Sequence, residues 1–235
     1  MNTKNLSKIL LPAVIGTASL LLSGTLFGTY AIQDDLVVEG DAILEQSLEI
    51  QGNSFAYGPG SEASGHAALA GGSWSTASGN YSIGLGDYAL ALGYSAISLG
   101  QWNLTDGYGS FAVGEANTSS GIGSAAIGLG TTASGLLSTS FGNATTASGD
   151  HTTAFGRSTI AQGSHQVVIG RYNEAQGSAT SWDDSDDIFI IGNGTDSSNR
   201  SNALSVQKNG NAEFAGTVRV QPGGDISMGQ YTSGQ

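Results

Sequence analysis

Residues 110–137 read SFAVGEANTSSGIG-SAAIGLGTTASGLL, which is one fourteen-residue unit followed at once by a second copy. From Ser54 to Gly177 the unit recurs in nine tandem copies, with no insertion or deletion. Each copy carries two glycines seven residues apart. Self-similarity at a fixed period is the signature of a repeat architecture. This stretch therefore predicts a solenoid, in which one unit forms one coil.

The first glycine of each unit is predicted to lie at a structural turn, because glycine reaches positive φ without a steric cost. A second set of glycines, from Gly65 to Gly177, follows seven residues later and predicts a second turn in each unit. The first set consists of Gly58, Gly72, Gly86, Gly100, Gly114, Gly128, Gly142, Gly156 and Gly170.

Large and small side chains alternate before each first glycine, as in Phe111, Ala112 and Val113. This period of two is typical of a β-strand with one buried face. We expect the large residues to stack inside the coil and the small column to face a closely approaching partner. In the second half of each unit, an alanine column that includes Ala133 predicts a second, weaker strand.

Stacking of the units follows from their size. A strand pair of this length cannot bury its apolar face alone, whereas coiling sets each strand about 4.8 Å from its copies above and below. A narrow coil still has only a thin core, so we expect several coils to associate through the small-residue face. The fold class is predicted to be all-β, a parallel β-solenoid of 14-residue coils.

Composition limits the function classes. The chain has 235 residues, 37 glycines, no cysteine and a formal net charge of -12. Without cysteine there are no disulfides and no thiolate metal sites. The acidic balance argues against nucleic acid or an anionic membrane as partner. No nucleophile with a base and an orienting group is visible, so we expect no enzyme activity and no cofactor.

The first 31 residues have the pattern of a secretory signal peptide. Lys4 and Lys8 precede the apolar run Ile9–Leu22, and Thr29 and Ala31 are small residues spaced for cleavage. The alternative is an uncleaved membrane anchor, because the apolar run is nearly long enough to span a bilayer. In either case the rest of the chain is predicted to be exported, and we expect no membrane insertion of the mature chain.

Three further segments complete the predicted organisation. Residues 32–53 are interpreted as an N-terminal β cap or lead-in, since a solenoid needs an atypical first turn. Residues 54–177 form the nine coils. Residues 178–235 are interpreted as a C-terminal β cap with a frayed tail, containing a buried strand at Ile188–Ile191 and a hairpin turn at Asn209-Gly210.

The units Ser110–Gly114 and Ser124–Gly128, followed by Thr132–Gly135, resemble the head repeats of YadA-like trimeric autotransporter adhesins. The resemblance implies a left-handed parallel β-roll, packed side by side as a homotrimer at the cell surface or outside the cell. It implies adhesion to extracellular matrix, to cells or to a surface. The stalk, membrane anchor and neck motif of that family are not evident, so we expect a head without stalk and anchor.

Two other functions stay open. The chain could be a structural fibre or envelope component without a specific ligand. It could also be an ice-binding β-solenoid, because Thr131, Thr145 and Thr159 fall in one column. A flat threonine ladder on a solenoid surface suits that function.

Candidate binding residues fall into three groups. An adhesive patch is predicted for the aromatic residues Trp74, Tyr88, Tyr94, Trp102 and Tyr108, if they are exposed on one side. A calcium site is conceivable in the acidic loop at Asp183, Asp184, Asp186 and Asp187, although the EF-hand spacing is missing. His151 and His165 lie one unit apart and are expected to stack, as an exposed ladder or a two-histidine metal site.

Overall fold

The computed structural model describes residues 54–219, and within them the chain is built from β-strands and turns. The predictions for the signal peptide, the N-terminal lead-in and the frayed tail after residue 219 lie outside these residues. Twelve strands form the first sheet: β1 (Ser54–Tyr57), β3 (Ala68–Ser73), β5 (Ile83–Asp87), β7 (Ile97–Gln101), β9 (Phe111–Glu115), β11 (Ala125–Leu129), β13 (Thr139–Asn143), β15 (Thr153–Arg157), β17 (Val167–Arg171), β18 (Asp187–Asn193), β19 (Asn202–Gln207) and β20 (Ala212–Phe214).

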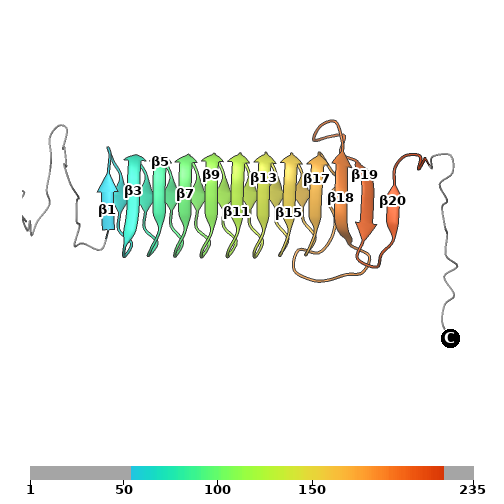
Figure 1. Ribbon diagram of the computed structural model, residues 1–235, viewed down its shortest axis with the longest axis horizontal. Coiled ribbons are helices and arrows are strands. Elements are labelled where there is room, and N and C mark those ends of the chain that lie inside the picture. Colours follow the sequence, from blue (N-terminus) through green and yellow to red (C-terminus); the bar gives the residue numbers. More distant parts are fainter. Residues whose placement is uncertain (1–53, 220–235) are drawn as a thin grey trace, which may run out of the picture. The chain divides into compact units, whose positions relative to one another are not determined.

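A second sheet of eight two-residue strands closes the coils. The first nine strands of the larger sheet run parallel side by side (Figure 1). The second sheet contains β2 (Glu62–Ala63), β4 (Thr76–Ala77), β6 (Leu90–Ala91), β8 (Leu104–Thr105), β10 (Thr118–Ser119), β12 (Thr132–Ala133), β14 (Thr146–Ala147) and β16 (Ile160–Ala161).

Strand pairing follows the sequence period without a slip. Ala125 pairs with Thr139 and Gly128 with Gly142, each fourteen residues further along the chain. The predicted parallel β-solenoid with two strands per coil is therefore confirmed. It has eight complete coils, because the ninth unit contributes β17 but its second half, Glu174–Gly177, forms no strand.

The interior is lined by small residues, which corrects the expectation that the large side chains stack inside. Ala126 and Ala133 point inward and are fully buried. Ser124 and Thr131, each two residues before one of these alanines, are buried as well. The alternation was recognised correctly, but its two faces were assigned the wrong way round. Two sheets joined by short corners enclose too narrow a space for a column of leucine or phenylalanine, so those side chains lie on the outer face.

Polar groups in the interior pair with one another and with the backbone. Asn117 donates from Nδ2 to the carbonyls of Val113 at 3.0 Å and Gly128 at 2.8 Å. Its Oδ1 accepts from the Thr131 backbone N–H at 2.9 Å and from Thr131 Oγ1 at 2.7 Å. Asn103 donates in the same way to Leu99 and Gly114. These bonds hold successive coils together where apolar burial is small.

The two glycine columns serve different purposes. Every first glycine has positive φ, as predicted, but all except Gly58 lie within a strand, near its end, and not between strands. At Gly128, φ is +131°, and a Cβ would also lie 2.0 Å from the carbonyl oxygen of Gly142. At Gly135, in the second column, the requirement is close approach alone, since a Cβ would lie 1.9 Å from the Gly149 oxygen.

The segment after Gly177 covers the last coil. β18 continues the parallel sheet, with Val167 opposite Phe189, and β19 and β20 then add to it in antiparallel fashion. The predicted strand at Ile188–Ile191 and the turn at Asn209-Gly210 are both confirmed. Arg200 fixes the connection from β18 to β19, because its Nη1 donates to the carbonyls of Ser158 and Asn173.

Candidate functional site

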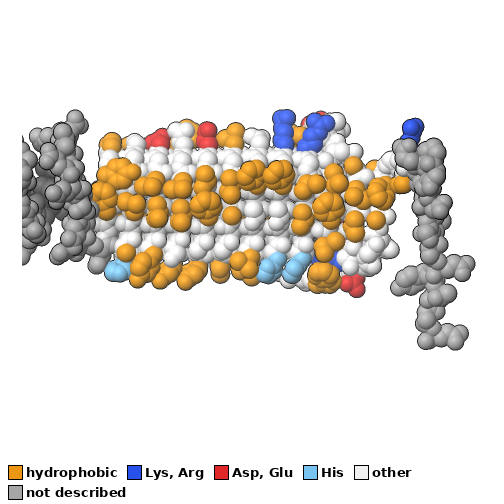
Figure 2. All heavy atoms as spheres, viewed as in Figure 1, with side chains coloured by type: hydrophobic (Ala, Val, Ile, Leu, Met, Phe, Trp, Pro, Cys, Tyr) orange, Lys and Arg blue, Asp and Glu red, His pale blue; other side chains and the backbone are white. Residues whose placement is uncertain are grey.

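The outer side of the first sheet is an exposed apolar surface, here called the apolar sheet face. Figure 2 shows its side chains as hydrophobic bands that run across the successive strands. Phe141 and Phe155 are 42% and 51% exposed, and their rings stack with centroids 5.1 Å apart. The face consists of Phe55, Tyr57, Leu69, Ile83, Leu85, Ile97, Leu99, Phe111, Val113, Ala125, Ile127, Phe141, Phe155, Val167 and Ile169. A contiguous apolar surface of this kind marks an interaction site.

Two edges bound the apolar sheet face. Because strands β1 to β17 are parallel, all of them start at one edge and end at the other. The strand-start edge is the corner that precedes each of these strands and includes His66, Tyr81, Tyr94, Tyr108, His151 and His165. The strand-end edge consists of the last residue of each strand and the corner that follows it. It includes Trp74, Asp87, Tyr88, Trp102, Glu115, Arg157, Arg171 and Tyr172.

Three residues of the predicted adhesive patch lie on the strand-end edge. Trp74, Tyr88 and Trp102 have φ between 51° and 55°, in the left-handed region that favours glycine. Trp74 and Tyr88 stack, with centroids 6.4 Å apart and ring planes 16° apart. Both tryptophans are 55% exposed. Because large side chains gain little burial at this corner, packing into the core does not explain why aromatic residues occur there.

The other two residues of the patch lie on the strand-start edge. Tyr94 and Tyr108 stack in parallel with ring centroids 4.9 Å apart. Tyr81 and His66 extend this stack through edge-on contacts of 5.4 Å each. Within one chain the predicted patch is therefore two aromatic columns on opposite edges. The sequence analysis missed Tyr81 and His66, although Tyr81 precedes Tyr94 by 13 residues and His66 precedes it by 28, two full units, which placed both at the same corner.

Positive charge gathers at one end of the strand-end edge. Arg157 and Arg171 end β15 and β17, pair in register and are exposed. Tyr172 follows, with the guanidinium of Arg157 at 5.7 Å and that of Arg200 at 5.8 Å from its ring centroid. Cation–π contacts of this kind hold the guanidinium groups near the ring. The sequence analysis did not single out this cluster.

At the same end of the strand-start edge, His151 and His165 stack with centroids 4.8 Å apart, as predicted. Trp182 packs edge-on against His165 at 5.7 Å and so fixes the acidic loop to this edge. Asp184 accepts a hydrogen bond from Trp182 Nε1, and Asp183 accepts from Ser185 Oγ and N–H. The Ser185 hydroxyl and backbone bonds hold the pKa of Asp183 below its ordinary value.

The four loop aspartates do not converge on one point. Asp186 pairs with Lys208 at 3.4 Å, whereas Asp187 is buried at the start of β18. Across residues 54–219 no three carboxylate or imidazole groups lie close enough to share a metal ion. Among these residues, neither the conceivable calcium site nor the two-histidine site gathers three carboxylate or imidazole groups.

Asp187 is the one aspartate of the loop that is fully buried. Gln176 Nε2 donates to its Oδ2, while Oδ1 has no hydrogen-bond partner. Burial raises the pKa of this carboxyl above its ordinary value. Asp187 lines a polar cavity of about 610 Å³ at the end of the solenoid, together with Glu174, Arg200 and Glu213.

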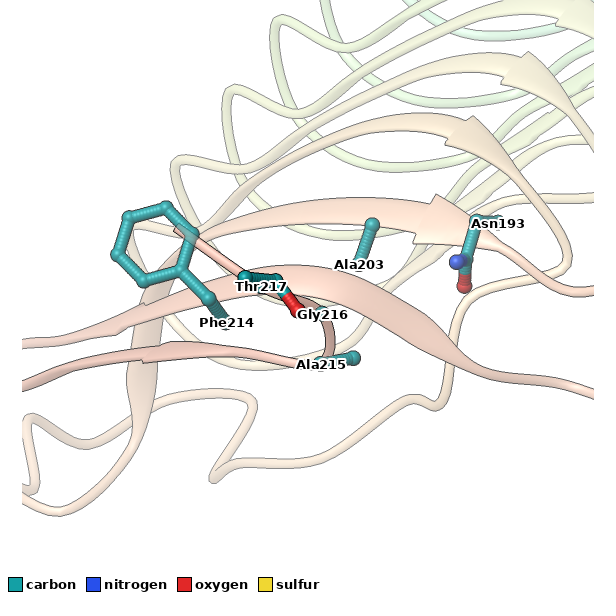
Figure 3. A pocket seen from close by; sticks show the side chains of 6 residues that line it. All are labelled: Asn193, Ala203, Phe214, Ala215, Gly216 and Thr217. Carbon is teal, nitrogen blue, oxygen red and sulfur yellow. The ribbon is translucent and has the colours of Figure 1, made fainter. Parts of the chain in front are cut away.

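A second, shallower cavity lies beside β20. Its volume is about 310 Å³, and Figure 3 shows its lining around the last antiparallel strands. The lining residues are Asn193, Ala203, Phe214, Ala215, Gly216 and Thr217. None of them is an acid, a base or a nucleophile with an activating partner, so this cavity has no arrangement for catalysis.

The threonine column is inside the coil, which corrects the prediction of an ice-binding ladder. Thr131, Thr145 and Thr159 are fully buried. They occupy the same inward position as Asn103 and Asn117, where the enclosed space accommodates a residue of that size. Ice cannot contact these buried side chains, so the threonine column gives no support for ice binding.

Comparison with known families agrees with the repeat structure. The YadA head domain repeat matches residues 133–159 in two copies. No curated protein matches the chain. In the part of the chain that the structure describes, no helix is long and apolar enough to cross a membrane. The matched residues lie inside an unbroken run of register-paired coils, and the match together with the β-solenoid supports a YadA-like head domain.

Proposed function

We propose that this protein is an exported, adhesin-like surface protein that works by binding through a side-by-side homotrimer. The observation that carries the proposal is the apolar sheet face, which runs along all the coils and has no covering element among residues 54–219. A second copy of the chain offers an apolar surface of the same length that could cover it. The family resemblance supports three copies, and the signal pattern in residues 1–31 supports export.

Ligand binding is assigned to the aromatic columns at the two edges. Trp74 and Trp102 occupy a corner position that Gly60 and Gly130 fill in other coils. A glycine there would avoid the cost of positive φ, which is about 1 kcal/mol for other residues. Exposed aromatic groups in that position suit contact with matrix, a cell or a surface. Three copies of each column would raise avidity above that of a single contact.

The assembly is tested by the mass of the wild-type protein in solution. Light scattering at micromolar concentration should give three chains per particle, and a monomer would sink the proposal. Function is tested by surface adherence of W74A/W102A. We expect this variant to remain trimeric and to lose adherence. The control is I160A, which shortens a half-buried apolar side chain on the second sheet and should adhere as the wild type does.

If W74A/W102A and wild type adhere equally, or neither adheres to any surface tried, the adhesive assignment fails. The alternative, a structural fibre or envelope component without a specific ligand, would then account for the trimer.

A further inference from the structure

The two edges of the apolar sheet face carry opposite charges at the same coils. Arg157 and Arg171 lie side by side on the strand-end edge, where parallel pairing brings like charges together. Within residues 54–219 the only ion pair joins Lys208 to Asp186, so neither arginine has a carboxylate in ion-pair contact. Like charges on neighbouring strands are destabilising. The arrangement therefore calls for an anionic partner.

On the strand-start edge, the same coils carry exposed carboxylates. Asp183 and Asp184 lie in the loop that Trp182 holds against His165, the residue two positions before β17. The loop folds on itself through the bonds of Asp183 to Ser185 and of Trp182 to Asp184, so the carboxylates are held in place. Lys208 makes its ion pair with Asp186 and leaves these two without one.

Within one chain the arginines and these aspartates cannot meet, because they lie at opposite ends of the strands. A strand of five residues spans about 13 Å from its first to its last Cα. In an assembly whose rotation axis runs parallel to the solenoid, the apolar faces turn inward. The strand-end edge of one copy then lies against the strand-start edge of the next, coil by coil.

We propose that Arg157 and Arg171 of one copy bind the acidic loop at Asp183 and Asp184 of the neighbouring copy, and that this contact sets the direction and register of the assembly. The inference rests on the side-by-side assembly of the proposed function. Charge complementarity of this kind selects one arrangement against others, since a shifted or reversed copy leaves the charges unpaired or opposed.

The chief competing arrangement is antiparallel. It would bring the strand-end edge against itself in reverse, with Arg157 and Arg171 facing the part of that edge that carries Asp87 and Glu115. Side-chain sizes favour the parallel form. In that form the residue three positions before the first glycine of one copy meets the residue directly before that glycine at the same coil in the next copy. The pairs Thr139 with Phe141, Thr153 with Phe155 and Leu69 with Gly71 each set a large residue against a smaller one.

An antiparallel pair would instead set the residues directly before the first glycines of the two copies against one another. That brings the phenylalanines against leucine and valine while the threonines face isoleucine and phenylalanine. Large residues would then crowd one half of the interface and leave the other half loosely packed.

Disulfide trapping tests the contact directly, because the chain contains no cysteine. We expect R171C/D184C, oxidised as the assembled full chain, to form covalent multimers that reducing agent dissolves. The two single variants R171C and D184C should form none of these closed multimers. An intrachain bond is out of reach, since a disulfide needs Cα atoms within about 7 Å. Cross-linking of R171C/D87C but not of R171C/D184C would overturn the proposal in favour of the antiparallel form.

Charge reversal provides the second test. R157E/R171E should weaken assembly about tenfold at low salt, and D183K/D184K should do the same. Combining all four changes in one chain should restore assembly to within about threefold of wild type. R219E, which reverses a charge away from both edges, should leave assembly unchanged. If the four changes together assemble no better than either pair and R171C/D184C gives no cross-link, the contact does not exist.

The outcomes separate this contact from the proposed function. A monomeric wild type refutes the assembly itself. A trimeric wild type that is indifferent to all of these changes refutes only the charged contact.

Discussion

Replacing Gly128 with alanine should destabilise the solenoid far more than the addition of one methyl group would suggest. The residue has φ +131°, a region that costs other residues about 1–3 kcal/mol. The new Cβ would also lie 2.0 Å from the Gly142 oxygen, whereas ordinary contact begins at 3.4 Å. Moving that carbonyl weakens ladder hydrogen bonds, each worth about 1 kcal/mol. We therefore expect the free energy of unfolding to fall by about 3–5 kcal/mol.

The matched control lies two residues away in the same coil. Gly130 also has positive φ, +63°, but a Cβ there meets nothing within 4 Å. Neighbouring coils carry Ala116 and Ala144 at the same corner, with φ of 55° and 53°. Gly130→Ala should therefore cost only about 1 kcal/mol.

The measurement is urea unfolding followed by far-ultraviolet circular dichroism, with the slope compared between variants. A solenoid can lose cooperativity locally, so hydrogen exchange of β11 and β13 should accompany it. If Gly128→Ala and Gly130→Ala differ by less than about 0.5 kcal/mol, close stacking of the coils does not limit this column, and the reasoning is wrong.

Three further predictions concern the interior, the end of the solenoid and the apolar sheet face. Asn117→Ala should lower the free energy of unfolding in urea by about 2–4 kcal/mol, because it leaves the Thr131 N–H and the Gly128 carbonyl without their hydrogen-bond partner. Asn117→Thr should cost less, since Thr131 and Thr145 occupy the same position in the next coils. Burial raises the pKa of Asp187, so the folded chain holds the proton more tightly than the unfolded one, whose ordinary value is 3.8. Stability should then decline as the pH rises from about 3.8 through the raised folded pKa, and Asp187→Asn should remove this slope in melting temperatures measured from pH 3.5 to 7. Phe155→Glu should turn the assembly into monomers by light scattering, whereas Ile160→Glu, on the second sheet of the same coil, should not; equal behaviour of the two would exclude the apolar sheet face as the interface.

Much of the fold could be predicted from the period alone. A fixed spacing of fourteen residues determines the parallel register, and the alternation in Phe111, Ala112 and Val113 indicates a strand. The alternation does not tell which face is inside, because both faces of a strand have the same period. The deciding signal was size: in the nine repeat units, the column containing Ala112 and Ala126 holds no residue larger than valine, as a narrow interior requires.

The candidate site was harder to predict because it depends on corners. Tyr94 follows Tyr88 by six residues, close to half a coil, so the two lie on opposite edges although they are near in sequence. Counting positions within the unit would have divided the patch correctly. The buried position of Asp187 could not be predicted by counting repeat positions, because the loop from Glu174 to Asp186 departs from the repeat. Its course depends on tertiary contacts such as that of Trp182 with His165.

The unbroken register has an evolutionary consequence. Each coil pairs with near copies of itself, so removing residues 110–123 would bring Ile97 opposite Ala125 and join the same interior columns. Unequal recombination within the gene can thus lengthen or shorten the domain by whole coils, in steps of about 4.8 Å. Selection could adjust the length of the surface that the solenoid presents without redesigning a single contact.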